Sequence, residues 1–245
     1  MPRFFTAPFM GDDVVISGDD ATHIQRSLRM REGEQLTLCD GKGCDCLCEI
    51  VGFPGNEVSL RVVERVPSTC EPDVFVTLIQ AIPKGDKMEL IIQKSVELGV
   101  SRIIPVETVR CISRIDGDAA RAEKKQKRWQ KIANEAAGQS GRGILPQVMP
   151  AIGWKALLVW LAEQENDIKI VLYEGGGEPL RGLIKPECPG VVLIVGPEGG
   201  FDPHEIEGLN TVGVCCATFG PRILRCETAP IAALAVMMEL TNNLE

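Results

Sequence analysis

The stretch FGPRILRCETAPIAAL, residues 219–234, carries the densest group of side chains capable of chemistry. Its Arg222, Arg225 and Glu227 lie within six residues of one another, between an expected strand end and an expected helix start. Arginine can hold an anionic or polar substrate, and a neighbouring glutamate can orient that arginine or act as a general base. A solvated loop with a surface ion pair is the alternative, because charged loop residues are common.

A second candidate is the glycine-rich turn IVGPEGGF, residues 194–201, which leaves an apolar run. A phosphate-binding P-loop needs Lys followed by Ser or Thr after its last glycine, and Phe201 and Asp202 stand there instead. The glycines do not have the G-x-G-x-x-G spacing of a dinucleotide fingerprint either. Because Glu198 would also repel phosphate, the turn predicts a close backbone approach to a ligand other than a polyphosphate.

Three strand-and-loop units can bring these stretches together. The expected strands IKIVLY (168–173), VVLIV (191–195) and VCCATFG (214–220) run into the loops EGGGEP, GPEGGF and PRILRCE. In open α/β sheets, ligands bind outside the carboxyl ends of the strands. We therefore expect the three loops to form one pocket at one edge of the sheet.

Two helix starts are expected to hold the ends of these loops. After GPEGGF, Asp202 is suited to cap a helix that has Pro203 at its first position and Glu205 at its third. After PRILRCE, Thr228 is expected to cap a helix with Pro230 in its first turn, where the missing N–H costs little. The run AALAVMMEL that follows is typical of a helix buried against the sheet or a partner subunit.

The chain divides into a β-rich part and an alternating part. The first 70 or so residues hold two strand-like runs around the hairpin signal DGKG and a further strand at 57–66, before a proline-containing linker at 67–73. Expected strands and helices then alternate, at 75–82, 87–99, 102–107, 119–139 and 153–165. This alternation predicts an α/β fold with a mainly parallel sheet.

Composition places the chain among ordinary globular proteins. Its 245 residues are 44% apolar and 24% charged, and no apolar run reaches the roughly 18 residues of a membrane span. The start MPRFFTAPFMGDD lacks the basic and apolar regions of a signal peptide, so we expect a cytoplasmic protein with no membrane association. The formal net charge of −8 weighs against indiscriminate nucleic-acid binding but is compatible with a local basic site.

The ten cysteines indicate neither disulfides nor a metal centre. Cys44, Cys46 and Cys48 alternate along GCDCLCEIV, so they face one side of a strand. Zinc sites favour C-x-x-C spacing completed by a second pair or by histidines, and this chain has no such set. We expect free, mostly buried thiols and no bound metal.

Two further features have both a structural and a functional interpretation. The basic run RAEKKQKRWQK, residues 121–131, is most often a solvated helix face, but Trp129 would add base stacking if the run contacted nucleic acid. His204 falls in the first turn of a helix and is expected on the surface, whereas His23 suits either packing or RNA contact. The hydrolase motif G-x-S-x-G is absent from the sequence.

The motifs VGPEGGF and GPRILRCETAPIAAL together resemble the bacterial 16S ribosomal RNA uracil-N3 methyltransferases of the SPOUT superfamily. MPRFFTAP, THIQRSLRMREGEQLTLCDGKG, KGDKMELIIQKSVELGVSRIIPV and RWQKIANEAAGQSGR resemble that family in the same order, so the resemblance covers nearly the whole chain. It implies an enzyme that uses S-adenosylmethionine to methylate N3 of a specific uridine in 16S ribosomal RNA, on the assembled small ribosomal subunit.

The resemblance also implies an architecture. Residues 1–70 would form a small PUA-like β-barrel that binds RNA, and residues 73–245 a SPOUT-type α/β methyltransferase domain with a C-terminal deep trefoil knot. A homodimer would build each site from two subunits. Nothing in the residue pattern itself indicates a knot, and knots are rare in proteins generally.

The same resemblance implies residue roles. Arg225 would stabilise negative charge that develops on the uracil carbonyl oxygens, with Glu227 as its orienter or as the base. The residues expected to contact S-adenosylmethionine are Leu172, Tyr173, Glu174, Val195, Gly196, Pro197, Glu198, Gly199, Gly200, Phe219, Gly220, Ile223, Leu224 and Arg225. The residues expected to bind RNA are Arg3, Arg26, Arg29, Arg31, Lys84 and Arg222.

The chain departs from the family pattern at three pocket or helix-start positions. Cys226 stands where Thr is expected, Pro230 where Ala is expected and Phe219 where Leu is expected. These differences bear on the details of cofactor contact and leave the class unchanged. A SPOUT methyltransferase that modifies another nucleoside position, and a non-catalytic RNA-binding assembly factor, are the alternatives.

Overall fold

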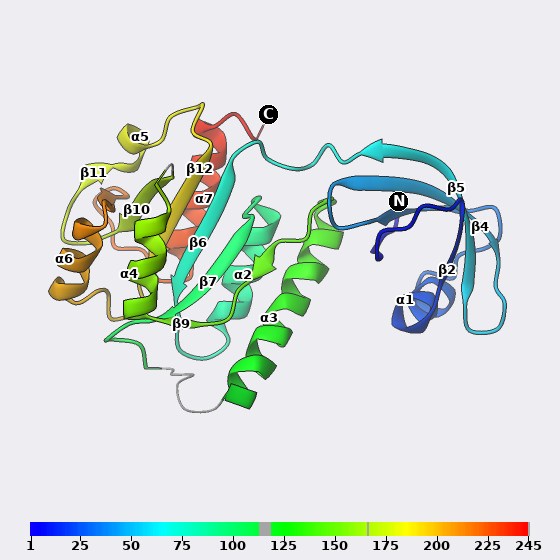
Figure 1. Cartoon of the computed structure of the whole chain (residues 1–245), viewed down its shortest axis with the longest axis horizontal. Helices are drawn as coiled ribbons and strands as arrows, with labels where there is room; N and C mark the ends of the chain where they lie inside the picture. Colours follow the sequence, from blue (N-terminus) through cyan, green and yellow to red (C-terminus); the bar gives the residue numbers. More distant parts are fainter. Residues whose placement is uncertain (113–118, 166, 245) are drawn as a thin grey trace. The chain divides into compact units, whose positions relative to one another are not determined.

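The computed structural model of the chain describes residues 1–112, 119–165 and 167–244 (Figure 1). The polypeptide forms two compact units. The first contains Met1–Glu71 and Ala137–Leu145, and the second contains Pro72–Ala136 and Pro146–Glu245. Each unit has its own hydrogen-bonded sheet.

The first unit is built on a five-stranded sheet with the order β1-β3-β4-β5-β2. β3 and β4 pair antiparallel around DGKG, so the expected hairpin is confirmed. A short helix, α1 (Gly18–Thr22), continues into a π-helical segment. His23 in that segment is exposed and meets Phe4 edge-on, with 6.0 Å between ring centroids, so packing and RNA contact are both compatible with its position. The strands are β1 (Arg3–Phe5), β2 (Asp13–Ile16), β3 (Gln35–Cys39), β4 (Cys44–Gly52) and β5 (Val58–Pro67).

The alternating cysteines of β4 pack inward, as their spacing predicts. Cys46 and Cys48 are buried in one core with Leu36, Leu38 and Ile50. All ten cysteines are free. Across the described part of the chain, no group of three or more His, Cys, Asp or Glu side chains is arranged to hold a metal ion. The thiols of β4 therefore act as small apolar side chains.

A buried ion pair fastens the segment Ala137–Leu145 within the first unit. The Arg142 side chain is 4% exposed, and its guanidinium donates to Glu71 Oε2 at 2.7 Å. Glu71 Oε1 also accepts the backbone N–H groups of Gly143 and Ile144, at 2.8 and 2.9 Å. Because one carboxylate accepts hydrogen bonds from three consecutive residues, the position of this segment depends on Glu71.

The second unit contains an eight-stranded sheet with the order β11-β13-β10-β12-β6-β7-β8, and β9 also pairs with β7. Every strand pair of this sheet within the described residues is parallel, which confirms the predicted α/β fold. The strands are β6 (Phe75–Ala81), β7 (Arg102–Glu107), β8 (Gln147–Val148), β9 (Ile152–Gly153), β10 (Ile168–Leu172), β11 (Glu178–Pro179), β12 (Gly190–Val195) and β13 (Cys215–Thr218).

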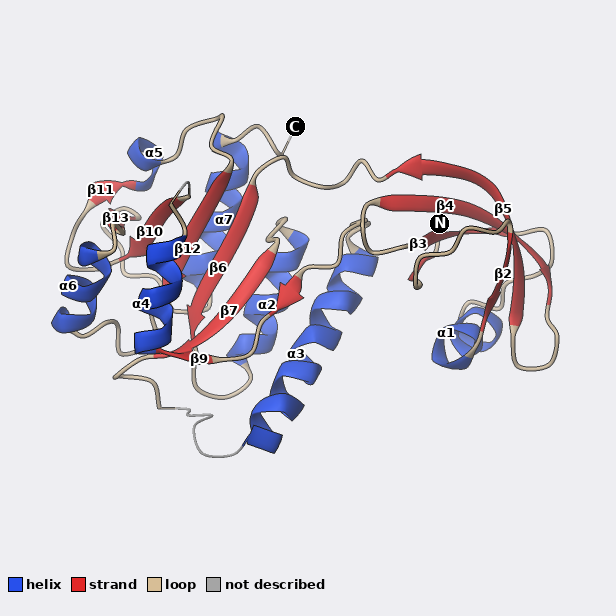
Figure 2. Cartoon of the chain, in the orientation of Figure 1, coloured by secondary structure: helices blue, strands red, loops and turns tan. Residues whose placement is uncertain are grey.

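Helices cover both faces of this parallel sheet (Figure 2). Helix α4 lies over one face, whereas α2 and α7 contact each other over the opposite face. No helix in the described ranges is both long and apolar enough to cross a membrane. The helices are α2 (Lys87–Glu97), α3 (Ala119–Gln139), α4 (Trp154–Glu163), α5 (Leu180–Leu183), α6 (Pro203–Thr211) and α7 (Thr228–Leu240).

Trp129 of helix α3 is buried, so the prediction that it could stack on a nucleic-acid base is wrong. The residue is only 5% exposed, because it lies on the apolar side of an amphipathic helix. The neighbouring cations on the outer side form ion pairs: Lys127 with Glu123 at 2.6 Å, and Arg128 with Glu89 at 2.7 Å. This basic run is therefore a solvated, salt-bridged helix face.

The strand order places three loops at one edge of the sheet. β10 lies between β12 and β13 and runs parallel to both. Their carboxyl ends therefore point the same way, and the loops after Leu172, Val195 and Thr218 start next to one another. This arrangement confirms the expectation that the three loops share one edge.

We expect Glu71→Ala to lower the free energy of unfolding by about 3 kcal/mol, because it leaves the buried Arg142 without its carboxylate. Urea denaturation followed by circular dichroism measures the loss. Glu123→Ala removes an exposed ion pair on α3 and is the matched control, with a much smaller expected loss. Equal losses in the two variants would contradict the role given to Glu71.

Candidate functional site

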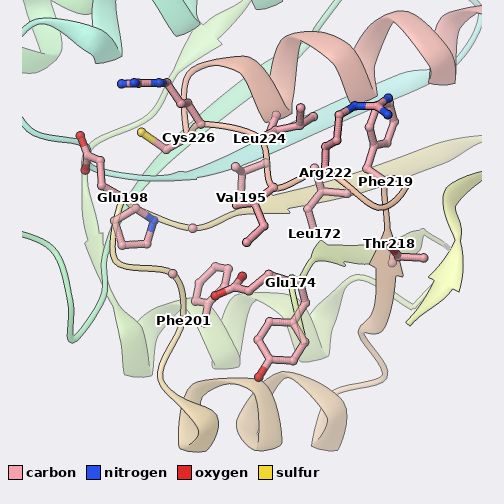
Figure 3. A pocket seen from close by; sticks show the side chains of 18 of the residues that line it. Leu172, Glu174, Val195, Glu198, Phe201, Thr218, Phe219, Arg222, Leu224 and Cys226 are labelled. Atoms are coloured by element: carbon pink, nitrogen blue, oxygen red, sulfur yellow. The ribbon is translucent and has the colours of Figure 1, made fainter. Parts of the chain in front are cut away.

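A pocket of about 690 Å³ lies where the three loops meet, in the second unit (Figure 3). Glu198 and Cys226 lie at one end of it, and Phe219 and Arg222 at the other. The structure brings together all the residues expected to contact a cofactor, namely Leu172, Tyr173, Glu174, Val195, Gly196, Pro197, Glu198, Gly199, Gly200, Phe219, Gly220, Ile223, Leu224 and Arg225. Lys87, Phe201 and Cys226 line the same space.

Two glycines of the loop after β12 lie tightly against neighbouring side chains. Gly200 has a φ of +65°, and a Cβ there would run into the Glu174 carboxylate. A Cβ on Gly196 would lie 3.1 Å from the Phe201 ring. The Glu174 side chain points toward the interior of the pocket (Figure 3). Glycine is therefore needed at position 200 both for the backbone conformation and for the placement of Glu174.

Helix α6 begins with the capping box that the sequence predicts. Asp202 Oδ1 accepts the His204 N–H at 3.1 Å, and Glu205 Oε2 accepts the Asp202 N–H at 2.9 Å. Glu205 is 2% exposed, and its Oε1 accepts the Val109 N–H at 2.8 Å. The His204 side chain is 90% exposed, as expected. One buried carboxylate thus ties the end of the glycine-rich loop to the segment that follows β7.

A charged cluster closes one end of the pocket. Lys87 Nζ lies 3.0 Å from Glu198 Oε1 and 3.2 Å from Glu227 Oε2. The Cys226 thiol donates to Glu227 Oε2 at 3.2 Å. The backbone N–H of Lys84 donates to Glu198 Oε1, also at 3.2 Å. Residues from the start of α2, the glycine-rich loop and the start of α7 therefore meet at one ammonium group.

The cluster shifts the pKa values of its own members. Burial alone would raise the pKa of Glu198 and Glu227, but hydrogen bonds from Lys87, Cys226 and backbone N–H groups outweigh burial, and both pKa values are lowered. Hydrogen bonds to the two carboxylates raise the pKa of Lys87. Burial, the hydrogen bond to Glu227 and the charge of Glu198 raise the pKa of the Cys226 thiol to about 12. At neutral pH the cluster thus holds two carboxylates, one ammonium and a neutral thiol.

Arg225 and Glu227 do not pair with each other, although the sequence places them two residues apart. Glu227 Oε2 is taken by Lys87 and Cys226, and within the described residues no ion pair joins Glu227 to Arg225. Arg225 lines the pocket as an exposed residue. The prediction that Glu227 orients Arg225 directly is therefore wrong for this structure, because the carboxylate is turned toward helix α2.

Thr228 does not cap helix α7, in contrast to the prediction. The Arg225 carbonyl already accepts the N–H groups of Thr228 and Ala229, both at 2.9 Å. The helical turn therefore begins before Thr228, and Glu227 occupies the cap position without a capping side-chain bond. Pro230 is buried in the first turn of α7, where a proline costs a helix least.

The residues expected to bind RNA do not belong to one unit. Lys84 and Arg222 lie in the second unit, and the first unit contains Arg3, Arg26, Arg29 and Arg31. The Arg3 side chain is 15% exposed, and its guanidinium makes two hydrogen bonds of 2.7 Å to the Asp45 carboxylate. Arg26, Arg29 and Arg31 are exposed. Arg3 is therefore paired with Asp45, whereas Arg26, Arg29 and Arg31 present their positive charge to solvent.

Comparison with known proteins covers both parts of the chain. The model of an RNA methyltransferase domain matches residues 70–238, and the model of an RNA methyltransferase PUA domain matches residues 16–63. The chain is 37% identical to ribosomal RNA small subunit methyltransferase E of Bacillus subtilis, over 94% of this chain and 91% of that protein. The chain belongs to the ribosomal RNA small subunit methyltransferase E family.

Solved structures of similar proteins show the same fold. Ribosomal RNA small subunit methyltransferase E of Neisseria gonorrhoeae, bound to S-adenosyl methionine, is 35% identical with a TM-score of 0.88, over 98% of both chains. A Legionella pneumophila protein described as a methyltransferase in complex with bound cofactor SAM is 33% identical with a TM-score of 0.86, over 97% of this chain and 96% of that one. Membership of the methyltransferase E family confirms the resemblance carried by the motifs.

Lys87 is a pocket residue that the family motifs do not reveal. It stands in KGDKMELII, where the motif gives no hint of a contact. Its position in the first turn of a helix is the sequence feature that could have indicated an ion-pair partner. A lysine in the first turn opposes the helix dipole, so a nearby negative partner is expected. Glu198 and Glu227 are those partners.

We expect Cys226, one of the departures from the methyltransferase E family pattern, to resist alkylation. Its pKa of about 12, against the ordinary 9.0, leaves about a thousandfold less thiolate near neutral pH. Because the pKa is raised, the labelling rate should still be rising at about pH 10. Iodoacetamide labelling with peptide mass spectrometry measures this rate, with the exposed Cys70 as internal control. Equal labelling rates of the two cysteines at about pH 8 would contradict the assignment.

Proposed function

We propose that this protein transfers a methyl group from S-adenosylmethionine to N3 of a specific uridine in 16S ribosomal RNA, on the assembled small ribosomal subunit. One observation carries the proposal: the three-loop pocket lies in a chain of the ribosomal RNA small subunit methyltransferase E family. Both motifs that carry the family resemblance, VGPEGGF and GPRILRCETAPIAAL, contribute residues to that pocket.

The pocket fits S-adenosylmethionine better than it fits a polyphosphate. Its lining includes the Glu174 carboxylate, which attracts a sulfonium or an ammonium group and repels phosphate. Gly196 and Gly200 allow the backbone to approach the adenosyl group closely. Two solved relatives hold this cofactor. When bound, S-adenosylmethionine supplies the electrophilic methyl group.

Arg225 is the residue we assign to charge stabilisation. Uracil N3 is a poor nucleophile while it carries its proton, so the enzyme must favour the deprotonated base. The exposed Arg225 guanidinium forms no ion pair with any described residue, so it is free to donate to the carbonyl oxygens on which negative charge develops. Positioning N3 in line with the methyl group supplies much of the remaining acceleration.

We assign Glu227 to positioning. Its lowered pKa makes its carboxylate a weak base for an imide proton. Its contacts with Lys87 and Cys226 instead hold the loop that carries Arg225 against helix α2. Glu227 therefore acts through the placement of the segment 222–226, and the uracil proton leaves to solvent.

The first unit is suited to RNA binding. The match of its residues 16–63 to an RNA methyltransferase PUA domain supports this role, and also supports closure of its sheet into a PUA-like barrel. Arg26, Arg29 and Arg31 supply exposed positive charge there. The net charge of −8 disfavours free RNA, so a substrate shaped by the assembled subunit suits this chain better. The target uridine must be unpaired or flipped out to reach the pocket.

The family resemblance supports a deep trefoil knot around the pocket loops, a homodimer and a cytoplasmic location, where ribosomal subunits are found. Helix α7 and the loop before it offer a surface for the second subunit. Ile223 is 86% exposed. Ile231, Ala235 and Val236 of α7 are only half-buried within one chain. Burial of these apolar side chains against a second copy would stabilise the dimer.

Methyl transfer from labelled S-adenosylmethionine to small subunits that lack the modification tests the proposed function. We expect labelled 3-methyluridine, identified by mass spectrometry of the nucleosides. Label in another nucleoside would retain the methyltransferase class and overturn the N3 assignment. Cofactor binding without any label would favour a non-catalytic RNA-binding assembly factor.

We expect Arg225→Ala to lower kcat by about a hundredfold, because it removes a donor aimed at developing charge. The affinity for S-adenosylmethionine, measured by isothermal titration calorimetry, should change much less than kcat. Arg181→Ala, at an exposed position of α5 outside the pocket lining, is the matched control and should leave kcat unchanged. Full activity of Arg225→Ala at normal cofactor affinity would refute the assignment.

A further inference from the structure

Lys87 occupies a position that its helix disfavours. It is the first residue of α2, where the N-terminal end of the helix dipole carries partial positive charge. A lysine there costs stability unless a negative group compensates. The Lys87 side chain is 32% exposed, and its ammonium forms ion pairs with two carboxylates instead of extending alone into solvent. The position therefore points to a specific interaction.

The interaction joins segments that are far apart in the sequence. Glu198, at 3.0 Å from Lys87 Nζ, lies 111 residues away along the chain. Glu227, at 3.2 Å, belongs to the start of helix α7, and its side chain is 18% exposed. The two carboxylates would repel each other at this separation without the cation between them. Lys87 is thus the connection between the glycine-rich loop and the loop that carries Arg225.

We propose that Lys87 is a positioning residue for cofactor binding, because its ammonium holds the glycine-rich loop and the start of helix α7 at the separation that S-adenosylmethionine requires. This inference rests on the proposed function. Lys87 acts through Glu198 and Glu227 and takes no part in methyl transfer itself. An exposed ion pair between two residues of one helix could not position the loops in this way, because it connects neither of them.

Helix α2 provides a matched control. Lys94 pairs with Glu97 on the same helix at 2.8 Å, three residues apart, outside the pocket lining. Lys94→Met therefore removes the same charge from the same helix without touching the connection between the loops. Lys87→Arg keeps the charge and can reach both carboxylates. Together with Lys87→Met, which removes the connecting ammonium, these two variants separate loop positioning from loss of charge and from general destabilisation.

Calorimetric titration of each variant with S-adenosylmethionine measures the effect. We expect Lys87→Met to weaken binding by about tenfold, Lys94→Met to leave it within about twofold, and Lys87→Arg to restore most of it. Unfolding midpoints by circular dichroism show that each variant is folded. Wild-type affinity in Lys87→Met would overturn the inference, whereas failure of the wild-type protein to bind would overturn the proposed function.

The pH dependence of binding gives a second readout. The titratable groups around Lys87 are the carboxyls of Glu198 and Glu227 and the thiol of Cys226. Lys87 helps to lower the pKa of both carboxyls, so wild-type affinity should fall only as the pH drops through those lowered values. Without Lys87 the burial of the carboxyls is less opposed and their pKa values rise, so the fall should begin at a higher pH than in the wild type. If the affinity for S-adenosylmethionine fell at the same acidic pH in the wild type and in Lys87→Met, the proposal would be contradicted.

Discussion

The parallel alignment of β12, β10 and β13 is the constraint on which the site depends. Because β10 pairs with both neighbours in the same direction, three loops from separate parts of the sequence must leave the sheet at one edge. None of those loops could form a pocket alone. The apolar strands, buried between helices on both faces, fix the loop origins, and the loops need only supply shape and charge.

The loops at this edge of the sheet combine a tightly packed glycine-rich backbone with a cluster of paired charges. Because Gly200 has no Cβ, the Glu174 carboxylate can occupy the space beside it and present a negative charge to the pocket. In the charged cluster, one ammonium holds two carboxylates, and burial together with those carboxylates keeps the Cys226 thiol protonated. A pocket for a methyl donor benefits from a neutral thiol, since a thiolate would be the stronger nucleophile.

Most short-range features of the sequence predicted the structure, with the Thr228 cap as an exception, whereas individual side-chain partners distant in the sequence did not follow from it. The hairpin around DGKG and the capping box at Asp202 depend on neighbouring residues, and both are present. Trp129 and Glu227 were misjudged because their partners are set by packing. Trp129 lies on the inner face of α3, and Glu227 turns toward Lys87, far away in the sequence. Local spacing carries no information about such partners.

The sequence by itself determined the α/β class, the edge at which the loops gather and the glycine-rich and arginine-bearing motifs of the pocket. These follow from hydrophobic periodicity and turn chemistry, which act over a few residues. Only the tertiary structure decided that Lys87 joins Glu198 to Glu227 and that Arg225 stands apart from that cluster. The physical reason is that ion-pair partners are chosen by distance in the folded chain, and the parallel sheet sets those distances.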